Sequence, residues 1–516
     1  MKKKSPIFIS TVCILSVCIM CFSCKKEEMH HPVDNLIASN PDRALPYTHT
    51  DWMQGMPDMT QLAKITMPGT HDCAADNHSG GIPDGSHWDV CCQDFRFSNQ
   101  LLMGVRWFDV RYDDVDKRLH HGGFVLSRSL QDFINDAISF LSDHPSETII
   151  FMIKKEYGGS SDGTFSNKVW DILNEYDQNH FYLSDIQPYL WQVRGKIVIA
   201  THDNTNPNHL TLGMSFSWPD NTTLHYDTYS NYRYYVQDHY SINWVSYDTK
   251  CNNVTDLMNT SYNYPDYGRF DLNFTSAERD GRATSIRTVA DNINGNIYSF
   301  LLNNIGWRHC GVIMLNYAGG ADDGSCCQDL LSMVIQHNDF QSVKIGSQVW
   351  MGYDLNVTTY RNGDNIPKVQ DAAEWSNLTT GAYCEDEYGK HYNWYAVNDS
   401  RGLAPSGWRI PTEADWDYLV DTAGGASIAG QNLKISGSVN WWTAIGKNYT
   451  LFTAYPTGFR ASNGTFGHYG EMGNWWTATE YNADDAVLFQ LYHNANWAKK
   501  FNDSKKLGLT VRCINE

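Results

Sequence analysis

Apolar runs and amphipathic stretches alternate along the first two thirds of the chain. The segment Leu130–Leu141 carries apolar side chains three and four positions apart, which predicts a helix. Ser129 suits the start of this helix, and Pro145 lies just beyond its end. Other segments are short, continuous apolar runs, which are typical of strands buried on both faces. These predicted strands are Val105–Tyr112, Thr148–Ile153, Lys196–Ala200, Phe270–Phe274 and Val312–Leu315. The alternation predicts an α/β fold, a parallel β/α barrel of irregular form. The Asn- and Tyr-rich stretches 204–240 and 252–267 predict long loops.

A further apolar run, Ile65–Asp72, reads Ile-Thr-Met-Pro-Gly-Thr-His-Asp. Because Pro cannot donate to a sheet ladder and Gly permits a sharp turn, we expect the strand to stop at Pro68 and Gly69. His71 then lies at the C-terminal end of a strand, where β/α barrels gather their catalytic residues. A lone His after a turn is more often an ordinary surface residue, so its role depends on partners at other strand ends.

The composition changes near Gln341, beyond which Trp, Gly, Asn and Tyr are frequent. One helix is predicted at Glu413–Leu419, after Pro411-Thr412. Short strands are predicted at Ser342–Met351, His391–Ala396, Thr450–Tyr455, Trp475–Ala478, Ala486–Tyr492 and Leu509–Cys513. We therefore predict a barrel domain over residues 46–339 and a loop-rich α+β domain over residues 340–516.

The N-terminus has the parts of an export signal. Lys2–Lys4 is basic, Ile7–Phe22 is a short apolar run, and a small residue precedes Cys24. This order resembles a bacterial lipoprotein signal peptide over residues 1–23, with lipid on Cys24 and a polar tether over residues 24–45. The alternative is a plain signal peptide in which Cys24 is incidental. We expect an exported protein, lipid-anchored to the bacterial cell envelope at the outer membrane or cell surface.

Composition narrows the class of partner. Hydrophobic residues make up 42% of the 516, which is enough for sizeable cores. The formal net charge of -19 argues against nucleic acid as a partner, because binding to its phosphates needs a basic face. A local cationic pocket for one phosphate stays compatible with this charge. Among the 13 cysteines, no C-x-x-C pair or Cys/His cluster has zinc-ligand spacing. In an exported chain we expect some disulfides.

Polar side chains gather at successive strand ends of the predicted barrel: His71 at the first, Arg111 at the second, His121 just after it, and Lys154 at the third. Two His, an Arg and a Lys around one mouth suit phosphate-ester chemistry. One His can take a proton from an attacking hydroxyl, the other can protonate the leaving oxygen, and the cations can hold phosphoryl oxygens.

Several of these segments resemble bacterial phosphatidylinositol-specific phospholipase C. The resemblance runs in consistent order over about residues 51–339 and implies a distorted TIM-like barrel. The matching segments are Trp52-Met53, Ile65–Asp72, Phe108–Arg111, Leu119–Gly122, Phe133–Asn135, Pro145–Ile150, Lys154–Tyr157, Arg194–Val198, Val236–Asp238 and Asn273–Ser276. The implied reaction is intramolecular transfer that releases diacylglycerol and inositol 1,2-cyclic phosphate, followed by slower hydrolysis of the cycle.

The resemblance also implies roles for individual residues. His71 resembles the general base that acts on the inositol 2-hydroxyl, and His121 resembles the general acid that protonates the diacylglycerol oxygen. Asp72 would lie beside the leaving group with His121. Arg111, from the strand that also carries Asp109, would bind the phosphate. The positions that match inositol-binding residues are Lys154, Asp238 and Tyr240.

We predict no metal and no cofactor. Calcium-dependent relatives need several oxygen ligands near the first His, typically an Asn after it and acids on the next strand. Here Asp72 follows the His, and the next strand carries Arg111, which would neutralise the phosphoryl charge and repel a metal ion. The same Arg disfavours a glycerophosphodiesterase, which would need a divalent metal on a similar barrel.

Two positions depart from the family pattern. Asn316 stands where the family has the carboxylate that orients the base; Asn accepts a hydrogen bond but cannot stabilise imidazolium by charge, and loss of such a carboxylate is costly. His202 stands where the family has a substrate-contacting Arg, which leaves the head-group specificity open. Reduced activity, a related head group and an inactive binding barrel all stay open.

The segments after Gln341 resemble the Fib-succ-major paralogous domain, which belongs to surface lipoproteins and implies a C-type-lectin-like fold. They are Val343–Met351, Tyr388–Ala396, Gly407–Thr412, Trp475-Trp476 and Val511–Cys513. The many Trp could form a platform for a glycan, but we favour a structural role for most, because large aromatics must fill a loop-rich fold. Cys384 and Cys513 could pair in a disulfide.

Our main hypothesis is therefore a lipid-anchored, metal-independent phosphodiesterase that cleaves phosphatidylinositol or a glycosylated relative. The alternative is a catalytically weak or inactive surface lipoprotein that binds glycan or lipid through a degenerate barrel and a lectin-like module.

Overall fold

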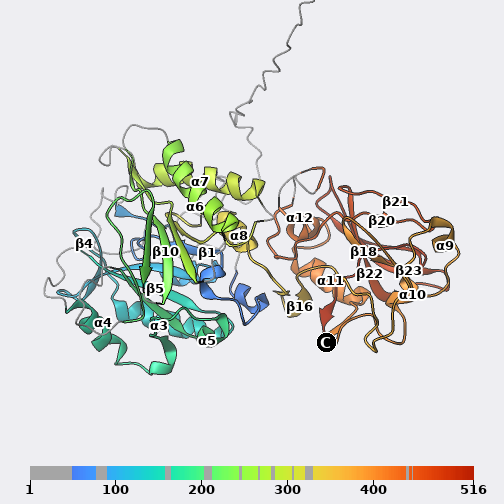
Figure 1. Ribbon diagram of the computed structural model, residues 1–516, viewed down its shortest axis with the longest axis horizontal. Coiled ribbons are helices and arrows are strands. Elements are labelled where there is room, and N and C mark those ends of the chain that lie inside the picture. Colours follow the sequence, from blue (N-terminus) through green and yellow to red (C-terminus); the bar gives the residue numbers. More distant parts are fainter. Residues whose placement is uncertain are drawn as a thin grey trace, which may run out of the picture. The chain divides into compact units, whose positions relative to one another are not determined.

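The apolar runs of the first domain form neighbouring strands of one curled sheet, drawn from blue to yellow in Figure 1. Its parallel strands are β1 (Met67–Thr70), β2 (Trp107–Asp113), β5 (Ile149–Lys155), β6 (Phe181–Tyr182), β7 (Ile197–His202), β8 (Met214–Phe216), β10 (Tyr232–Gln237), β12 (Arg269–Phe274) and β14 (Val312–Leu315). The order β6-β7-β5-β2-β1-β14-β12-β10 is parallel throughout, with β8 alongside β7. The predicted distorted TIM-like barrel is therefore confirmed.

The computed structural model describes residues 49–76, 90–156, 164–202, 212–229, 231–242, 247–264, 268–279, 285–304, 307–319, 329–436, 441–443 and 446–516. The predicted signal peptide, the tether and Cys24 lie outside these ranges. The described chain belongs to one compact unit, so the domain boundary at residues 339 and 340 stays a prediction.

Short antiparallel strands extend the sheet at its margins, and helices surround it. The added strands are β3 (Arg118–His121), β4 (Phe124–Val125) and β9 (His225–Tyr229), and a separate pair is β11 (Ser241–Ile242) with β13 (Glu278–Arg279). The helices are η1 (Trp52–Gly55), η2 (Leu62–Lys64), α2 (Phe97–Leu102), α3 (Leu130–Asp143), α4 (Phe165–Leu173), η3 (Gln178–His180), α5 (Leu190–Val193), α6 (Tyr247–Asn263), α7 (Ile286–Asn303) and α8 (Leu330–Gln336). None of the described helices is long and apolar enough to cross a membrane.

Helix α3 confirms the helix predicted at Leu130–Leu141. Ser129 and Asp132 form a reciprocal capping box at its start.

The two predicted long loops are wrong in large part. Helix α6 and strands β9 and β10 occupy much of them. The sequence of α6 is rich in Asn, Thr and Tyr, which are poor helix formers, and its burial of Val254, Leu257 and Met258 decides its conformation.

The expected strand end at Pro68 is also wrong, since β1 continues through Pro68 and Gly69 to Thr70. The carbonyl of Pro68 still accepts a hydrogen bond from the amide of Arg106, so the strand keeps one ladder bond there. Gly69 allows the side chain of Met314 to pack closely against β1, because a Cβ at this position would lie 2.3 Å from the Met314 sulfur. His71 follows the strand directly, as expected.

Tyrosine hydroxyls link the two margins of the barrel. No backbone ladder joins β8 to β10 among the described strands. Instead, Tyr232 on β10 bonds to both backbone groups of Ser215, and Tyr234 does the same at Ser217, over 3.0 and 2.8 Å. The aromatic rings of Trp107, Phe216 and Phe270 fill the interior below the strand ends, with centroids 5.7 to 6.1 Å apart. The barrel floor is therefore packed, and polar groups collect at its mouth.

The C-terminal region is built from small sheets and short helices, as predicted. Its strands are β15 (Ser342–Ile345), β16 (Gln348–Met351), β17 (Tyr383–Asp386), β18 (Gly389–Tyr392), β19 (Trp408–Arg409), β20 (Phe459–Arg460), β21 (Phe466–Gly467), β22 (Met472–Glu480), β23 (Asp485–Tyr492), β24 (Ala498–Ser504) and β25 (Ile514–Asn515). Its helices are α9 (Ala372–Ser376), α10 (Trp394–Val397), α11 (Glu413–Thr422) and α12 (Ala429–Leu433). Six of its Trp side chains are fully buried, which confirms a structural role for most of them.

Two predicted strands of this region are absent from the described chain, and a third, His391–Ala396, is strand only to Tyr392, because helix α10 begins at Trp394. Residues 450–455 contain Leu451 and Thr453 at φ 57° and 55°, which no strand accommodates. In the segment 509–513, Leu509 bridges to Tyr392 while Thr510 bridges to Trp475, so no continuous ladder forms.

The suggested Cys384–Cys513 disulfide is wrong. Both thiols are free, and they belong to different apolar clusters: Cys384 packs with Trp375, and Cys513 packs with Trp476. The described cysteines form no disulfide with one another.

Candidate active site

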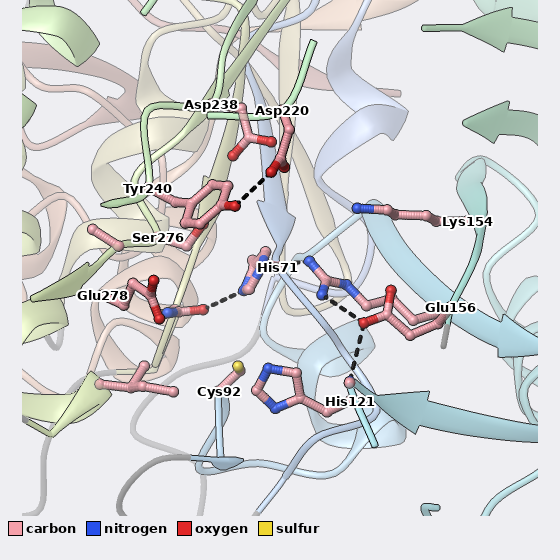
Figure 2. A pocket seen from close by; sticks show the side chains of 15 residues that line it. His71, Cys92, His121, Lys154, Glu156, Asp220, Asp238, Tyr240, Ser276 and Glu278 are labelled. Carbon is pink, nitrogen blue, oxygen red and sulfur yellow. Dashed lines mark hydrogen bonds and ion pairs between the residues drawn. The ribbon is translucent and has the colours of Figure 1, made fainter. Parts of the chain in front are cut away.

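A cavity of about 290 Å³ opens at the C-terminal ends of the barrel strands (Figure 2). Seven predicted site residues line it: His71, Arg111, His121, Lys154, Asp238, Tyr240 and Asn316. Asp72 and Asp109 are buried beside them and contact Arg111. The structure thus brings nine of the ten predicted catalytic and substrate-binding residues to one mouth.

His71 lies at the centre of the cavity between an amide and a guanidinium (Figure 2). Its Nδ1 is 2.9 Å from Oδ1 of Asn316, and its Nε2 is 2.6 Å from Nη2 of Arg111. Because a guanidinium only donates, Nε2 must be the acceptor, and the ring proton lies on Nδ1. Burial and the charge of Arg111 hold the pKa of His71 well below its usual value. His71 is therefore a neutral imidazole at pH 7.

Arg111 is held by three carboxylates. Its Nε lies 3.1 Å from Oδ2 of Asp109 and 3.6 Å from Oδ2 of Asp72, and its Nη1 lies 3.4 Å from Oε1 of Glu156. Burial alone would raise the pKa of Asp109, but the adjacent guanidinium lowers it to about 2. These acids fix the guanidinium and leave its outer donors at the cavity.

His121 faces the buried carboxylate of Asp72, with 3.8 Å between Nε2 and Oδ2. Its Nδ1 lies 2.6 Å from the carbonyl of Val90, which orients the ring. Burial raises the pKa of Asp72 well above its usual value, although Arg111 opposes this shift. Asp72 also has a left-handed backbone, at φ 42°, and strain of this kind gathers at functional sites. The pair is suited to hold a proton between a carboxylate and an imidazole.

The opposite wall of the cavity carries the predicted inositol-binding residues. Tyr240 donates to Oδ2 of Asp220 over 2.8 Å, and Trp218 donates to Oδ2 of Asp238 over 3.0 Å. Behind them Lys250 is fully buried, and burial lowers its pKa to about 7. This wall offers hydroxyl and carboxylate groups of the kind that bind sugar-like rings.

His202 is the predicted residue that the structure does not place at the cavity. It is buried at the end of β7, and its ring lies 3.8 Å from the ring of Trp218, centroid to centroid. Its ring contacts Trp218, which donates to Asp238 on the substrate wall. Substrate binding by His202 therefore stays a prediction.

Sequence reasoning missed several residues that line the cavity: Cys92, Gly122, Glu156, Asp220, Ser276, Ala277, Glu278 and Ile286. Glu156 follows β5 within the Lys-Lys-Glu-Tyr segment, and a charge count at that strand end could have found it. It accepts from both Arg111 and the amide of Gly122, over 3.4 and 3.0 Å. Glu278 lies in β13 and Ile286 begins α7, and the remaining residues come from loops, whose course no local pattern indicates.

Comparisons with known proteins agree with this geometry. Residues 65–203 match the family described as "Phosphatidylinositol-specific phospholipase C, X domain", and residues 343–515 match "Fibrobacter succinogenes major domain". The chain is 31% identical over 307 residues to 1-phosphatidylinositol phosphodiesterase of Staphylococcus aureus (strain Newman), which covers 56% of this chain and 94% of that protein. The corresponding enzyme of Listeria monocytogenes is 31% identical over 188 residues, 34% of this chain and 56% of that protein.

A solved variant of phosphatidylinositol-specific phospholipase C from Staphylococcus aureus is similar in fold, with a TM-score of 0.51 and 27% identity. The match covers 57% of this chain and 97% of that structure. A β/α barrel with two His around one partly buried Arg defines a class of enzymes that act on phosphate esters by acid–base catalysis. Within that class, the chain belongs to the family of bacterial phosphatidylinositol-specific phospholipases C, and it carries an additional Fibrobacter succinogenes major domain.

Proposed function

We propose that this chain cleaves phosphatidylinositol, or a glycosylated relative, by attack of the inositol 2-hydroxyl on its own phosphate. One observation carries this proposal. The guanidinium of Arg111 contacts both sides of the cavity, at 2.6 Å from Nε2 of His71 and 3.6 Å from Oδ2 of Asp72, the partner of His121. A phosphate bound to Arg111 would therefore lie between a base and an acid.

In the first step, the phosphate draws the donors of Arg111 away from Nε2 of His71. The freed lone pair takes the proton of the 2-hydroxyl, and that oxygen forms a bond to phosphorus. Asn316 keeps the other ring proton on Nδ1, so that Nε2 stays available as the base. The low pKa of His71 suits this role, because the imidazole is already neutral when the substrate arrives.

The bond from phosphorus to the glycerol oxygen breaks in the same step, and His121 gives its proton to that oxygen. Asp72 stabilises the imidazolium before transfer. The products are diacylglycerol and inositol 1,2-cyclic phosphate. In the slower second step the roles reverse: His121 takes a proton from water, and His71 returns one to the 2-oxygen.

Product analysis tests this function. The full chain is incubated with phosphatidylinositol vesicles and EDTA, and the soluble phosphates are followed by phosphorus NMR. We expect the cyclic phosphate first and the acyclic phosphate later, without added metal. His120→Gln is a matched control, because His120 adjoins His121 in the sequence but pairs with Asp116 over 2.7 Å; this variant should keep its rate. A folded protein that yields no cyclic phosphate at any pH would contradict the proposal.

We further propose that the chain is exported and lipid-anchored through Cys24. The support is the sequence order of basic residues, apolar run, small residue and Cys. About 20 tether residues, fully extended, reach roughly 70 Å, which lets the cavity approach a lipid surface. Labelling with radioactive palmitate in a bacterial host should modify the full chain and not Cys24→Ala. Equal labelling of both would contradict the anchor site.

We also propose a glycan as a ligand of the C-terminal domain. The support is Trp442, which is 65% exposed, whereas seven other Trp of this domain are buried. An exposed indole can stack on a sugar ring. A glycan array should bind the full chain and lose binding in Trp442→Ala. Trp191→Ala, which alters a Trp on the barrel helix α5 that is 55% exposed, is the control. Binding unaffected by Trp442→Ala would contradict this role.

A further inference from the structure

The acid side of the cavity holds three side chains of the types that bind zinc. A carboxylate oxygen of Asp72, the sulfur of Cys92 and a ring nitrogen of His121 all lie within 4.8 Å of one another. Cys92 and His121 lie side by side in Figure 2 and line the cavity. The three residues come from the end of β1, the segment before α2 and the end of β3. Their spacing in the sequence therefore gives no indication of a shared site.

Asp72 brings unused hydrogen-bonding capacity to this cluster. It is fully buried, and neither carboxylate oxygen has a hydrogen-bond partner. Its nearest cationic atoms are Nε of Arg111 at 3.6 Å and Nε2 of His121 at 3.8 Å. Buried polar atoms are ordinarily hydrogen-bonded, so a buried carboxylate that makes no hydrogen bond and faces an imidazole indicates a position for a further cation.

The carbonyl of Val90 orients the other two side chains. It lies 2.6 Å from Nδ1 of His121 and 3.7 Å from the sulfur of Cys92. A His that donates one ring N–H to a backbone carbonyl presents its other nitrogen in a fixed direction, which is the usual arrangement of metal-bound His. Here that nitrogen, Nε2, faces Asp72.

We propose that Asp72, Cys92 and His121 bind Zn²⁺ and that the bound ion inhibits the enzyme. Sulfur and imidazole ligands favour zinc, whereas calcium takes six to eight oxygens. Three protein ligands leave the fourth tetrahedral position for water or a phosphoryl oxygen. On binding, Cys92 releases its thiol proton to solvent, and His121 releases the Nε2 proton that it carries as the general acid. The thiolate and the carboxylate then balance the two charges of the ion, so Arg111 faces a nearly neutral complex.

Inhibition follows from the atom to which zinc binds. A metal on Nε2 of His121 takes the lone pair that must carry the proton for the leaving glycerol oxygen. The inhibitory effect therefore rests on the proposed function, whereas the binding of zinc does not.

Binding is tested on the full chain with Co²⁺ as a spectroscopic probe and with Zn²⁺ by calorimetry. We expect a thiolate-to-cobalt absorption band and displacement of cobalt by zinc. Cys92→Ser should abolish the band and weaken zinc binding by at least about tenfold. Cys91→Ser is the matched control, because the sulfur of Cys91 contacts the carbonyl of Asp76 instead. Equal binding by the two variants, or no thiolate band in the unaltered chain, would overturn the site.

Two additions keep the test decisive. If thermal melting shows that Cys92→Ser is unfolded, Asp72→Asn replaces it with the same expectation for zinc affinity. In the activity assay, each variant is compared with its own zinc-free rate, and EDTA should restore the rate of the unaltered chain. Zinc that binds without slowing turnover would overturn the inhibition. A chain with no turnover would contradict the proposed function and leave the titration to decide the site.

Discussion

On the base side of the cavity, Nδ1 of His71 lies 2.9 Å from the amide oxygen of Asn316, whereas on the acid side His121 faces the carboxylate of Asp72. Both imidazoles lie close to Arg111 or to its partner Asp72, and both are largely removed from solvent. The difference is the charge of the supporting group, which is neutral for His71 and ionisable for His121.

This difference fits the state in which each residue must start. A general base begins neutral, and burial together with the nearby guanidinium keeps His71 neutral. A general acid begins protonated, and a carboxylate stabilises that form. The base side lacks this stabilisation once His71 has taken a proton, because the neutral Asn316 cannot stabilise the imidazolium by charge. We therefore expect proton removal from the 2-hydroxyl to limit the rate.

The largest expected effects separate the two His by the nature of the leaving group. His71→Ala and His121→Ala should each lose about 10³-fold in kcat on phosphatidylinositol, since each removes one proton transfer. On a nitrophenyl phosphodiester of inositol, the leaving group needs no proton, so His121→Ala should recover most of its loss and His71→Ala none. The rates follow from nitrophenol release. Equal recovery in both variants would remove the distinction between the sides.

Arg111→Lys should cost about 10²-fold in kcat/KM, because the compact ammonium cannot contact the phosphate, His71 and the acids together. The loss should appear with both substrates, because Arg111 serves both sides. Steady-state kinetics with the two substrates measures it. A loss confined to one substrate would assign Arg111 to one side only.

Asn316→Asp should raise kcat by about tenfold, because a carboxylate stabilises the imidazolium of His71. The added charge also raises the pKa of His71, so the acidic limb of the rate profile should move to higher pH. Asn316→Leu, which removes the acceptor, should lower kcat instead. Rate profiles against pH for the three proteins measure these shifts, and identical profiles would show that the support of His71 does not limit the reaction.

Lys250→Met should have the smallest effect of these variants on the reaction, because Lys250 lies behind the substrate wall, away from both His. We expect a higher KM with kcat unchanged. Burial lowers the pKa of Lys250 from 10.5 to about 7 in the folded chain. Between these values the unfolded chain holds a proton that the folded chain releases, so stability rises with pH. Urea unfolding at both ends of this range should show the rise, and Lys250→Met should lack it.

Continuous apolar runs made the centre of the barrel predictable. Strands β5, β7 and β14 are buried on both faces, so their sequences carry few polar interruptions, and the residues that follow them fall at the mouth by geometry alone. Lys154 was found in this way, and His71 and Arg111 were found at the ends of the neighbouring strands β1 and β2. The family resemblance then added His121 and Asn316.

The rest depends on contacts between distant segments. Helix α6 has weak intrinsic preference and forms because its apolar side meets the barrel. Trp218 covers His202, and no local pattern places an indole there. Cys92 lies next to His121 only because the segment before α2 returns to the end of β3. Such placements follow from tertiary packing, which a single sequence does not reveal.

The central claim is that the substrate's own hydroxyl, activated by His71, attacks the phosphate before water does. The direct measurement is turnover of phosphatidylinositol in water labelled with heavy oxygen, followed by mass spectrometry of the products. The account predicts a cyclic phosphate without label, which then becomes an acyclic phosphate with one labelled oxygen. Labelled acyclic phosphate that appears without a preceding cyclic product would contradict it.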